Sequence, residues 1–121
     1  MEREDFGLQW LLELHGYIVN LDHGYWWKAE AWLVPPSVLC PHGVRYSLTL
    51  HNEHNTRIFG YDNAHGIKTA SKGKFASRIV RDHVHLTSTD KGHPYEFSSA
   101  TQLLEDFFKN SEEIIKRRTK R

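Results

Sequence analysis

The sequence has little cysteine and proline and no long apolar run. Its 121 residues include one cysteine, Cys40, and four prolines. One cysteine excludes an internal disulfide and a cysteine-rich zinc ribbon, and it favours a reducing compartment. No stretch approaches the roughly 20 apolar residues that a membrane-spanning helix needs. The first six residues, MEREDF, are acidic and polar, unlike a signal peptide. We therefore expect a cytoplasmic protein with no membrane segment.

The sequence also lacks a strong net charge. Sixteen Lys and Arg against 15 Asp and Glu give a formal charge of +1, which excludes a histone-like polycation. It does not exclude nucleic-acid binding, because a sum hides local asymmetry. Hydrophobic residues at 39% and aromatic residues at 12% predict a folded chain, and its length predicts a single domain over residues 1–121. The abundant residue is histidine, of which there are nine.

The apolar periodicity predicts an α+β domain: an antiparallel sheet of about five strands packed against a C-terminal amphipathic helix and a short N-terminal helix. In the C-terminal helix Ser99 and Gln102 have the spacing of a capping box, and Leu103 and Phe107 share one face. The remaining elements are predicted by alternation and turn residues: a helix at 4–15 and strands at 17–21, 25–34, 44–52, 57–62 and 79–87.

The strand at 25–34 is rich in aromatic residues. Alternation places Tyr25 and Trp27 on one face and Trp26 and Trp32 on the other. One interpretation is a central strand covered on both faces, by the two helices. The other is a partner-binding surface, where tryptophan is enriched. Core burial is the favoured interpretation, because a small domain needs its large side chains for the core.

The segment from Asn63 to Arg81 contains basic residues and no acidic residue. Its glycines would let a phosphate approach the backbone closely, and Phe75 would offer a ring for base stacking. The alternative is a solvated loop whose Phe75 packs into the core. The predicted nucleic-acid-binding residues are Lys68, Lys72, Lys74, Phe75 and Arg78.

Histidines and aspartates border this basic segment. On a strand, His83 and His85 share a face with Arg81. Two imidazoles beside a guanidinium suit RNA cleavage without a metal: one removes the 2′-hydroxyl proton, the other protonates the leaving 5′ oxygen, and Arg81 stabilises charge on the phosphate. Asp62 would orient His65 through a hydrogen bond. The candidate catalytic residues are therefore Asp62, His65, Arg81, His83 and His85.

The same side chains admit two other interpretations. His83 and His85, completed by Asp62 or His65, could ligate a metal ion, and the His51 and His54 pair is a weaker candidate. Neither set has the spacing of a known zinc motif, so we predict no metal and no cofactor. The histidines could also simply pair with their neighbours in the sheet.

Four segments in this order resemble the TumE family of bacterial toxins. They are WKAEAWLV at 27–34, PHGVRYSLTL at 41–50, FGYDNAH at 59–65 and YEFSSATQLLEDFF at 95–108. The resemblance covers about residues 25–115 and implies a toxin encoded beside a cognate antitoxin, usually a small helix-turn-helix DNA-binding protein. It implies no particular catalytic mechanism.

Together these observations predict the toxin of a type II toxin–antitoxin pair, acting on RNA as a metal-independent endoribonuclease. The expected partners are RNA and the antitoxin, with the protein as a homodimer or a hetero-oligomer with that antitoxin. The alternative is a non-enzymatic module that inhibits a cellular target by binding nucleic acid or protein.

Overall fold

The computed structural model describes residues 4–38, 40–63, 67–68, 79–80, 82–89 and 92–120. Helices α1 and α2 span Glu4–Glu13 and Ala100–Thr119, and a short 3-10 turn lies at Asp22–Gly24. The strands are β1 (Tyr17–Asn20), β2 (Trp26–Leu33), β3 (Val44–His51), β4 (Arg57–Asp62), β5 (Ile67–Lys68), β6 (Ile79–Val80), β7 (His83–His85) and β8 (His93–Pro94). The predicted α+β class is confirmed.

Six strands form one antiparallel sheet in the order β1-β2-β3-β4-β7-β8, one strand more than expected. Strands β5 and β6 form a separate two-stranded sheet. The strand predicted at 79–87 is therefore wrong as a single element: its two ends, β6 and β7, belong to different sheets. Alternation cannot reveal such a break, because it reports faces and not partners.

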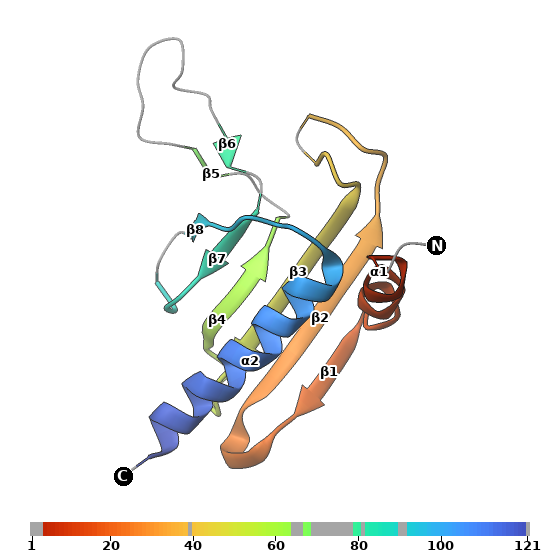
Figure 1. The fold of residues 1–121 in the computed structure, drawn as a ribbon. Helices are drawn as coiled ribbons and strands as arrows, with labels where there is room; N and C mark the ends of the chain where they lie inside the picture. Colours follow the sequence, from red (N-terminus) through yellow and green to blue (C-terminus); the bar gives the residue numbers. More distant parts are fainter. Residues whose placement is uncertain are drawn as a thin grey trace.

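Helix α2 crosses one face of the sheet, which we call the helix face (Figure 1). Phe107 of α2 packs against Trp27 and Phe59 with ring centroids 6.2 Å away in both pairs. Helix α1 lies against α2, where a Cβ on Gly7 would come within 2.6 Å of the Thr101 backbone nitrogen. This close approach needs glycine. The core thus lies between α1, α2 and the helix face.

The core consists of residues that alternate along the central strands, as the period of two predicts. On β3, Val44, Tyr46, Leu48 and Leu50 are buried. On β4 a β-bulge interrupts the alternation: Leu50 pairs with Phe59 and His51 with Arg57, which leaves the residue between them unpaired. Ile58 is that residue, and it is buried in the core together with Phe59.

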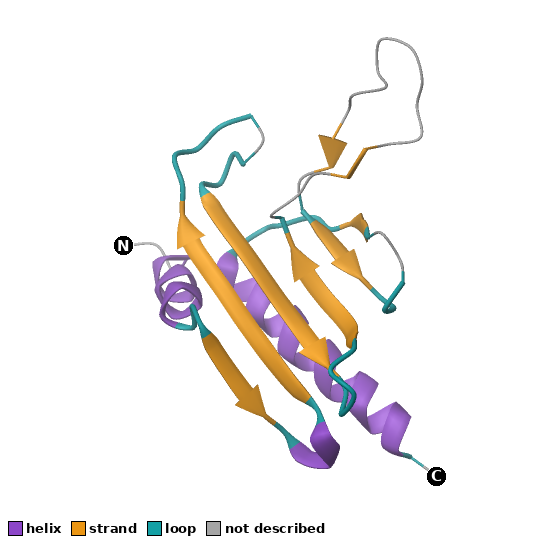
Figure 2. Cartoon of the chain, turned by 180° about the vertical axis from the view of Figure 1, so that it is seen from behind, coloured by secondary structure: helices purple, strands orange, loops and turns teal. Residues whose placement is uncertain are grey.

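The opposite face of the sheet, which we call the rear face, has none of the described helices over it (Figure 2). The expectation that both faces of the aromatic strand are covered is therefore wrong. Tyr25 and Trp27 lie in or against the core, whereas Trp32 is 43% exposed and Trp26 is half-buried. Both α1 and α2 lie on the helix face, so neither covers the rear face.

Helix α2 begins as predicted. Ser99 is the N-cap, and its hydroxyl accepts a hydrogen bond of 3.0 Å from the Gln102 backbone N–H. The reciprocal half of the capping box is replaced: the Gln102 side chain donates to Asp106 at 2.9 Å. Asp106 also accepts from the Tyr95 hydroxyl at 2.7 Å, which ties the segment after β8 to α2. None of the helices among the described residues is long and apolar enough to cross a membrane.

Candidate functional site

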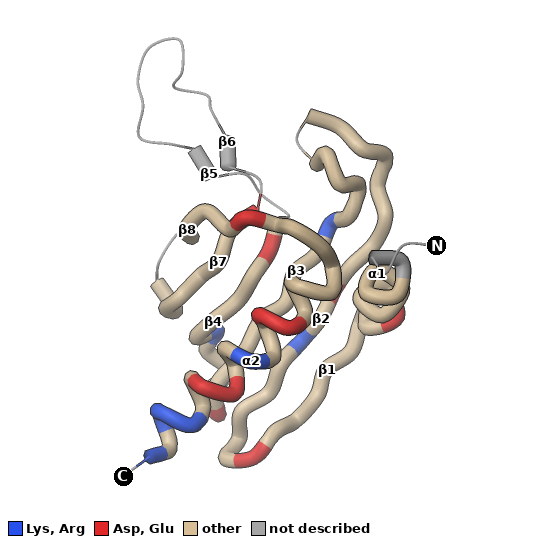
Figure 3. Tube along the Cα trace, viewed as in Figure 1, with Lys and Arg blue, Asp and Glu red and all other residues tan. Residues whose placement is uncertain are grey.

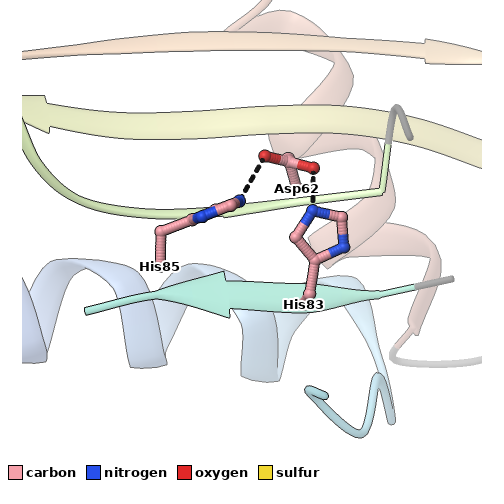
Figure 4. A group of neighbouring side chains, drawn as sticks. All are labelled: Asp62, His83 and His85. Carbon is pink, nitrogen blue, oxygen red and sulfur yellow. Dashed lines mark ion pairs between the residues drawn. The ribbon is translucent and has the colours of Figure 1, made fainter. Parts of the chain in front are cut away.

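Asp62, His83 and His85 meet on the rear face (Figure 4). Nε2 of His83 lies 2.6 Å from Oδ1 of Asp62, and Nε2 of His85 lies 3.3 Å from Oδ2. The two imidazole rings are 4.8 Å apart and nearly perpendicular, at 79°. One carboxylate thus holds two histidines, one on each oxygen.

The local sequence produces this arrangement through strand register. Asp62 of β4 pairs directly with His83 of β7, so both side chains rise from the same face. His85 lies two residues along β7, on the same face, opposite Gly60. From there the imidazole of His85 extends diagonally to Asp62. The intervening Val84 packs against the core instead.

The site is largely shielded from solvent. The exposed fraction of the side chain is 4% for His83, 10% for His85 and 17% for Asp62. Burial alone would raise the pKa of Asp62, but the hydrogen bond from His83 and the charges of His83 and His85 outweigh it and lower the pKa below its usual value. The carboxylate is therefore ionised at neutral pH.

The ionised carboxylate fixes how His83 is used. Since the ionised Asp62 lies 2.6 Å from Nε2, the proton of a neutral His83 is on that nitrogen. Nδ1 of His83 is buried and has no hydrogen-bond partner among the described residues. A neutral His83 therefore presents an unshared lone pair on Nδ1, as a histidine oriented by aspartate does in catalytic triads. The geometry provides a proton acceptor with its orienting group.

The same three residues are the only cluster of potential metal ligands within the described part of the chain, with ligand atoms within 4.8 Å of one another. Two histidines and a carboxylate suit zinc or iron. However, two atoms bound to one ion at about 2.1 Å each lie roughly 3 Å or more apart. The 2.6 Å between His83 and Asp62 is instead a hydrogen-bond distance.

The side chains of His51 and His54, the second histidine pair considered as metal ligands, do not point toward a common site. Nε2 of His51 lies 2.9 Å from the Thr49 hydroxyl, and its ring stacks on Trp26. His54 is exposed in the following turn, 3.8 Å from a carboxylate oxygen of Glu53. This arrangement does not resemble a metal site.

A second histidine–aspartate pair lies on the helix face, and sequence reasoning missed it. Nε2 of His42 lies 3.2 and 3.1 Å from the two oxygens of Asp82. The buried Tyr46 hydroxyl donates to Asp82 at 2.6 Å, and burial, followed by the charge of Asp82, raises the pKa of Tyr46. His42 also stacks on Phe97 with ring centroids 4.1 Å apart. Asp82 borders the basic segment in the sequence, but no pattern links it to His42.

Asn63 is likewise buried, although we expected it to begin the polar loop. Its Oδ1 accepts from the Tyr46 backbone N–H at 2.9 Å, and its Nδ2 donates to the Val44 carbonyl at 2.7 Å. The thiol of Cys40 donates to the same carbonyl at 3.3 Å, and Cys40 is buried. These bonds secure the end of β4 directly after Asp62.

The structure brings together three of the five candidate catalytic residues: Asp62, His83 and His85. His65 and Arg81 lie outside the described residues, so the predicted pairing of Asp62 with His65 stays a prediction. Lys72, Lys74, Phe75 and Arg78 also lie outside them, and for Lys68 only the backbone, in β5, is described. The basic segment as a nucleic-acid contact therefore also stays a prediction.

Comparison with known families identifies the chain. The family model described as Toxin TumE matches residues 13–116. The chain belongs to the TumE toxin family. The match contains both histidine–aspartate pairs and extends to the N-terminal side of the segment in which we saw the resemblance. Neither a curated protein nor a solved structure matches the chain.

Proposed function

We propose that this TumE family member is the toxin of a toxin–antitoxin pair and cleaves RNA at the cluster of Asp62, His83 and His85. The observation that carries the proposal is Nδ1 of His83, which has no hydrogen-bond partner among the described residues, while Nε2 of the same ring faces the ionised Asp62. An imidazole held in this way is a general base. A cognate antitoxin, expected to be a small DNA-binding protein, is the proposed partner.

In the proposed reaction, Nδ1 of His83 accepts the 2′-hydroxyl proton while the 2′ oxygen attacks phosphorus. The bond from phosphorus to the 5′ oxygen breaks, and a protonated His85 gives its proton to that oxygen. The products are a 2′,3′-cyclic phosphate and a 5′ hydroxyl. This step requires neither a water molecule nor a metal ion. Asp62 orients His83 and stabilises the imidazolium that forms. Arg81 and His65 stay predicted contributors near the phosphate.

One observation favours the non-enzymatic alternative. The side chains of His83 and His85 are only 4% and 10% exposed, so RNA does not reach them in this conformation. Under this alternative the three residues hold β4 against β7, and the protein acts by binding a cellular target. Catalysis requires a conformation in which both imidazoles are accessible to RNA.

The test is cleavage of RNA by the purified protein in excess EDTA. We expect the wild type to cleave and His83→Ala to lose about 10²- to 10⁴-fold in rate. His54→Ala is the matched control, because His54 lies exposed in a turn away from the cluster. If EDTA abolishes cleavage, the reaction depends on a metal ion and the metal-independent mechanism is wrong.

Growth measurements complete the test. Induced wild-type protein should arrest bacterial growth, and coexpression of the neighbouring antitoxin gene should restore it. If His83→Ala arrests growth as strongly as the wild type while remaining folded, the non-enzymatic module is the better account.

A further inference from the structure

We propose that the rear face of the sheet binds single-stranded RNA, with Trp26 and Trp32 contacting bases and Lys28, Arg45 and Arg57 contacting phosphates on either side of Asp62. This inference rests on the proposed function for the identity of the ligand. It is independent of the cleavage chemistry, since binding and cleavage are measured separately.

Strand register arranges the rear face in rows. One row joins Trp32 of β2 to Arg45 of β3. The next row joins Glu30, Ser47, Asp62 and His83 across four strands. The candidate catalytic row therefore has an aromatic residue and an arginine directly beside it.

The other side of the catalytic row repeats this pattern. After the row of Lys28, Thr49, Gly60 and His85 comes a row that joins Trp26, His51 and Arg57. At about 3.3 Å a residue, the rows of Trp26 and of Asp62 are roughly 13 Å apart along the strands. An extended RNA strand that crosses the catalytic row would thus meet a tryptophan and a cation on each side.

The charge of the rear face suits a polyanion. Among the described residues of β2, β3 and β4 on this face, the cations are Lys28, Arg45 and Arg57, and the acids are Glu30 and Asp62. The charge of Asp62 is already engaged by two histidines. The exposed side of α2 differs: it carries Glu105, Glu112 and Glu113 around the single basic residue Lys109, and its other basic residues lie in the last turn (Figure 3).

The aromatic residues are held in place for stacking. The rings of Trp26 and His51 are parallel within 7°, with centroids 3.9 Å apart, and the Trp26 indole N–H donates to Asn55 at 3.1 Å. Burial, followed by the charge of Lys28, lowers the pKa of His51, so the stacked imidazole is neutral at pH 7. His51 thus braces one side of the indole, and a base can stack on the other.

Trp32 is the more accessible platform. It is 43% exposed, and its one aromatic contact among the described residues is with His15, at a centroid distance of 5.9 Å and an angle of 74°. The exposed part of its ring is available to a ligand. Sheets that bind single-stranded RNA use aromatic side chains in this position to stack unpaired bases.

The experiment measures the dissociation constant of the full-length protein for a fluorescent single strand of about 12 nucleotides. The strand carries 2′-O-methyl groups, so it cannot be cleaved by attack of a 2′ hydroxyl. We expect Trp32→Ala and Lys28→Glu each to weaken binding by about 5- to 100-fold. Two matched controls lie on the helix side: Trp10→Ala, with Trp10 45% exposed, and Lys109→Glu on α2. Both should bind within about twofold of the wild type.

Three results would overturn the inference. They are wild-type protein that does not bind the strand, rear-face variants that bind as the wild type does, and control variants that lose as much. If the rear-face variants instead lose only binding to the antitoxin, the face is a protein interface. A cleavage assay on unmodified RNA separates the two proposals: wild-type protein that binds the strand but cleaves no RNA would end the proposed function alone.

Discussion

Two histidine–aspartate groups lie on opposite faces of the same sheet, and they differ in what surrounds the carboxylate. Asp82, on the helix face, binds a buried tyrosine hydroxyl and a histidine that stacks on Phe97. Asp62, on the rear face, holds two histidines, and one of them keeps an unpartnered ring nitrogen within the described residues. In the first group the Asp82 carboxylate has hydrogen-bond partners, whereas in the second Nδ1 of His83 is able to accept a proton.

The difference arises because successive side chains along an extended chain point to opposite faces of the sheet. Asp82 and His83 are neighbours, so their side chains must point to opposite faces. On the helix face the Asp82 carboxylate meets the packed end of β3 and contributes to stability. On the rear face His83 meets Asp62, with no described helix above. Adjacent positions in the chain therefore have separate roles.

The largest expected effect comes from exchanging each carboxylate for an amide. Asp62→Asn should lower the RNA cleavage rate by about 10²- to 10⁴-fold, because an amide no longer fixes the tautomer of His83. Asp82→Asn should leave the rate of the folded protein within about threefold. Single-turnover kinetics on both variants measure this contrast, and equal losses would show that the two groups work as one network.

The next contrast compares aromatic residues on the two faces. Phe107→Ala should lower the free energy of unfolding by about 3–5 kcal/mol, because Phe107 of α2 is fully buried against Trp27 and Phe59 of the sheet. Trp32→Ala should change it by no more than about 0.5 kcal/mol. Urea denaturation measures both values. A large loss in Trp32→Ala would mean that the rear face is part of the core.

A smaller effect separates charged from neutral hydrogen bonds. Tyr46→Phe removes a donor to the Asp82 carboxylate and should cost about 1.5–3 kcal/mol. Tyr61→Phe removes only the acceptor for the Asn110 amide and should cost about 0.5–1.5 kcal/mol. The pair is compared by urea denaturation. If Tyr46→Phe costs no more than Tyr61→Phe, Asp82 is not an important anchor of the helix face.

The smallest effect is a dependence of stability on pH. The pKa of Asp62 is lower in the folded chain than its ordinary value of 3.8. Its ionised form therefore stabilises the fold above that value, and this contribution disappears as the pH falls through the folded pKa. The stability difference between the wild type and Asp62→Asn should shrink as the pH falls below about 4. A difference that grows in this range would contradict the ion pairs of Asp62 with His83 and His85.

Much of the fold could be predicted from local patterns. The strand bounds at β3 and β4 and the Ser99 cap follow from alternation and capping, which depend on neighbouring residues. Alternation also placed His83 and His85 on one face. It could not show that Asp62 pairs with His83, because register between distant strands depends on the whole sheet.

The missed features are those that depend on packing. His42 reaches Asp82 across 40 positions of sequence, and no periodic signal links them. The exposure of Trp32 was also missed, because composition favours burial of tryptophan while the placement of α1 and α2 on one side decides otherwise. Long-range contacts of this kind need the tertiary structure.

The central claim is that the 2′ hydroxyl of RNA is the nucleophile and His83 is its base. The most direct measurement uses an RNA strand in which a single 2′-deoxy nucleotide replaces the one at the mapped cleavage position, incubated with wild-type protein in EDTA. The account predicts that cleavage stops at that position and that the unmodified strand yields a 2′,3′-cyclic phosphate. Continued cleavage of the deoxy strand, or a linear phosphate as the first product, would contradict it.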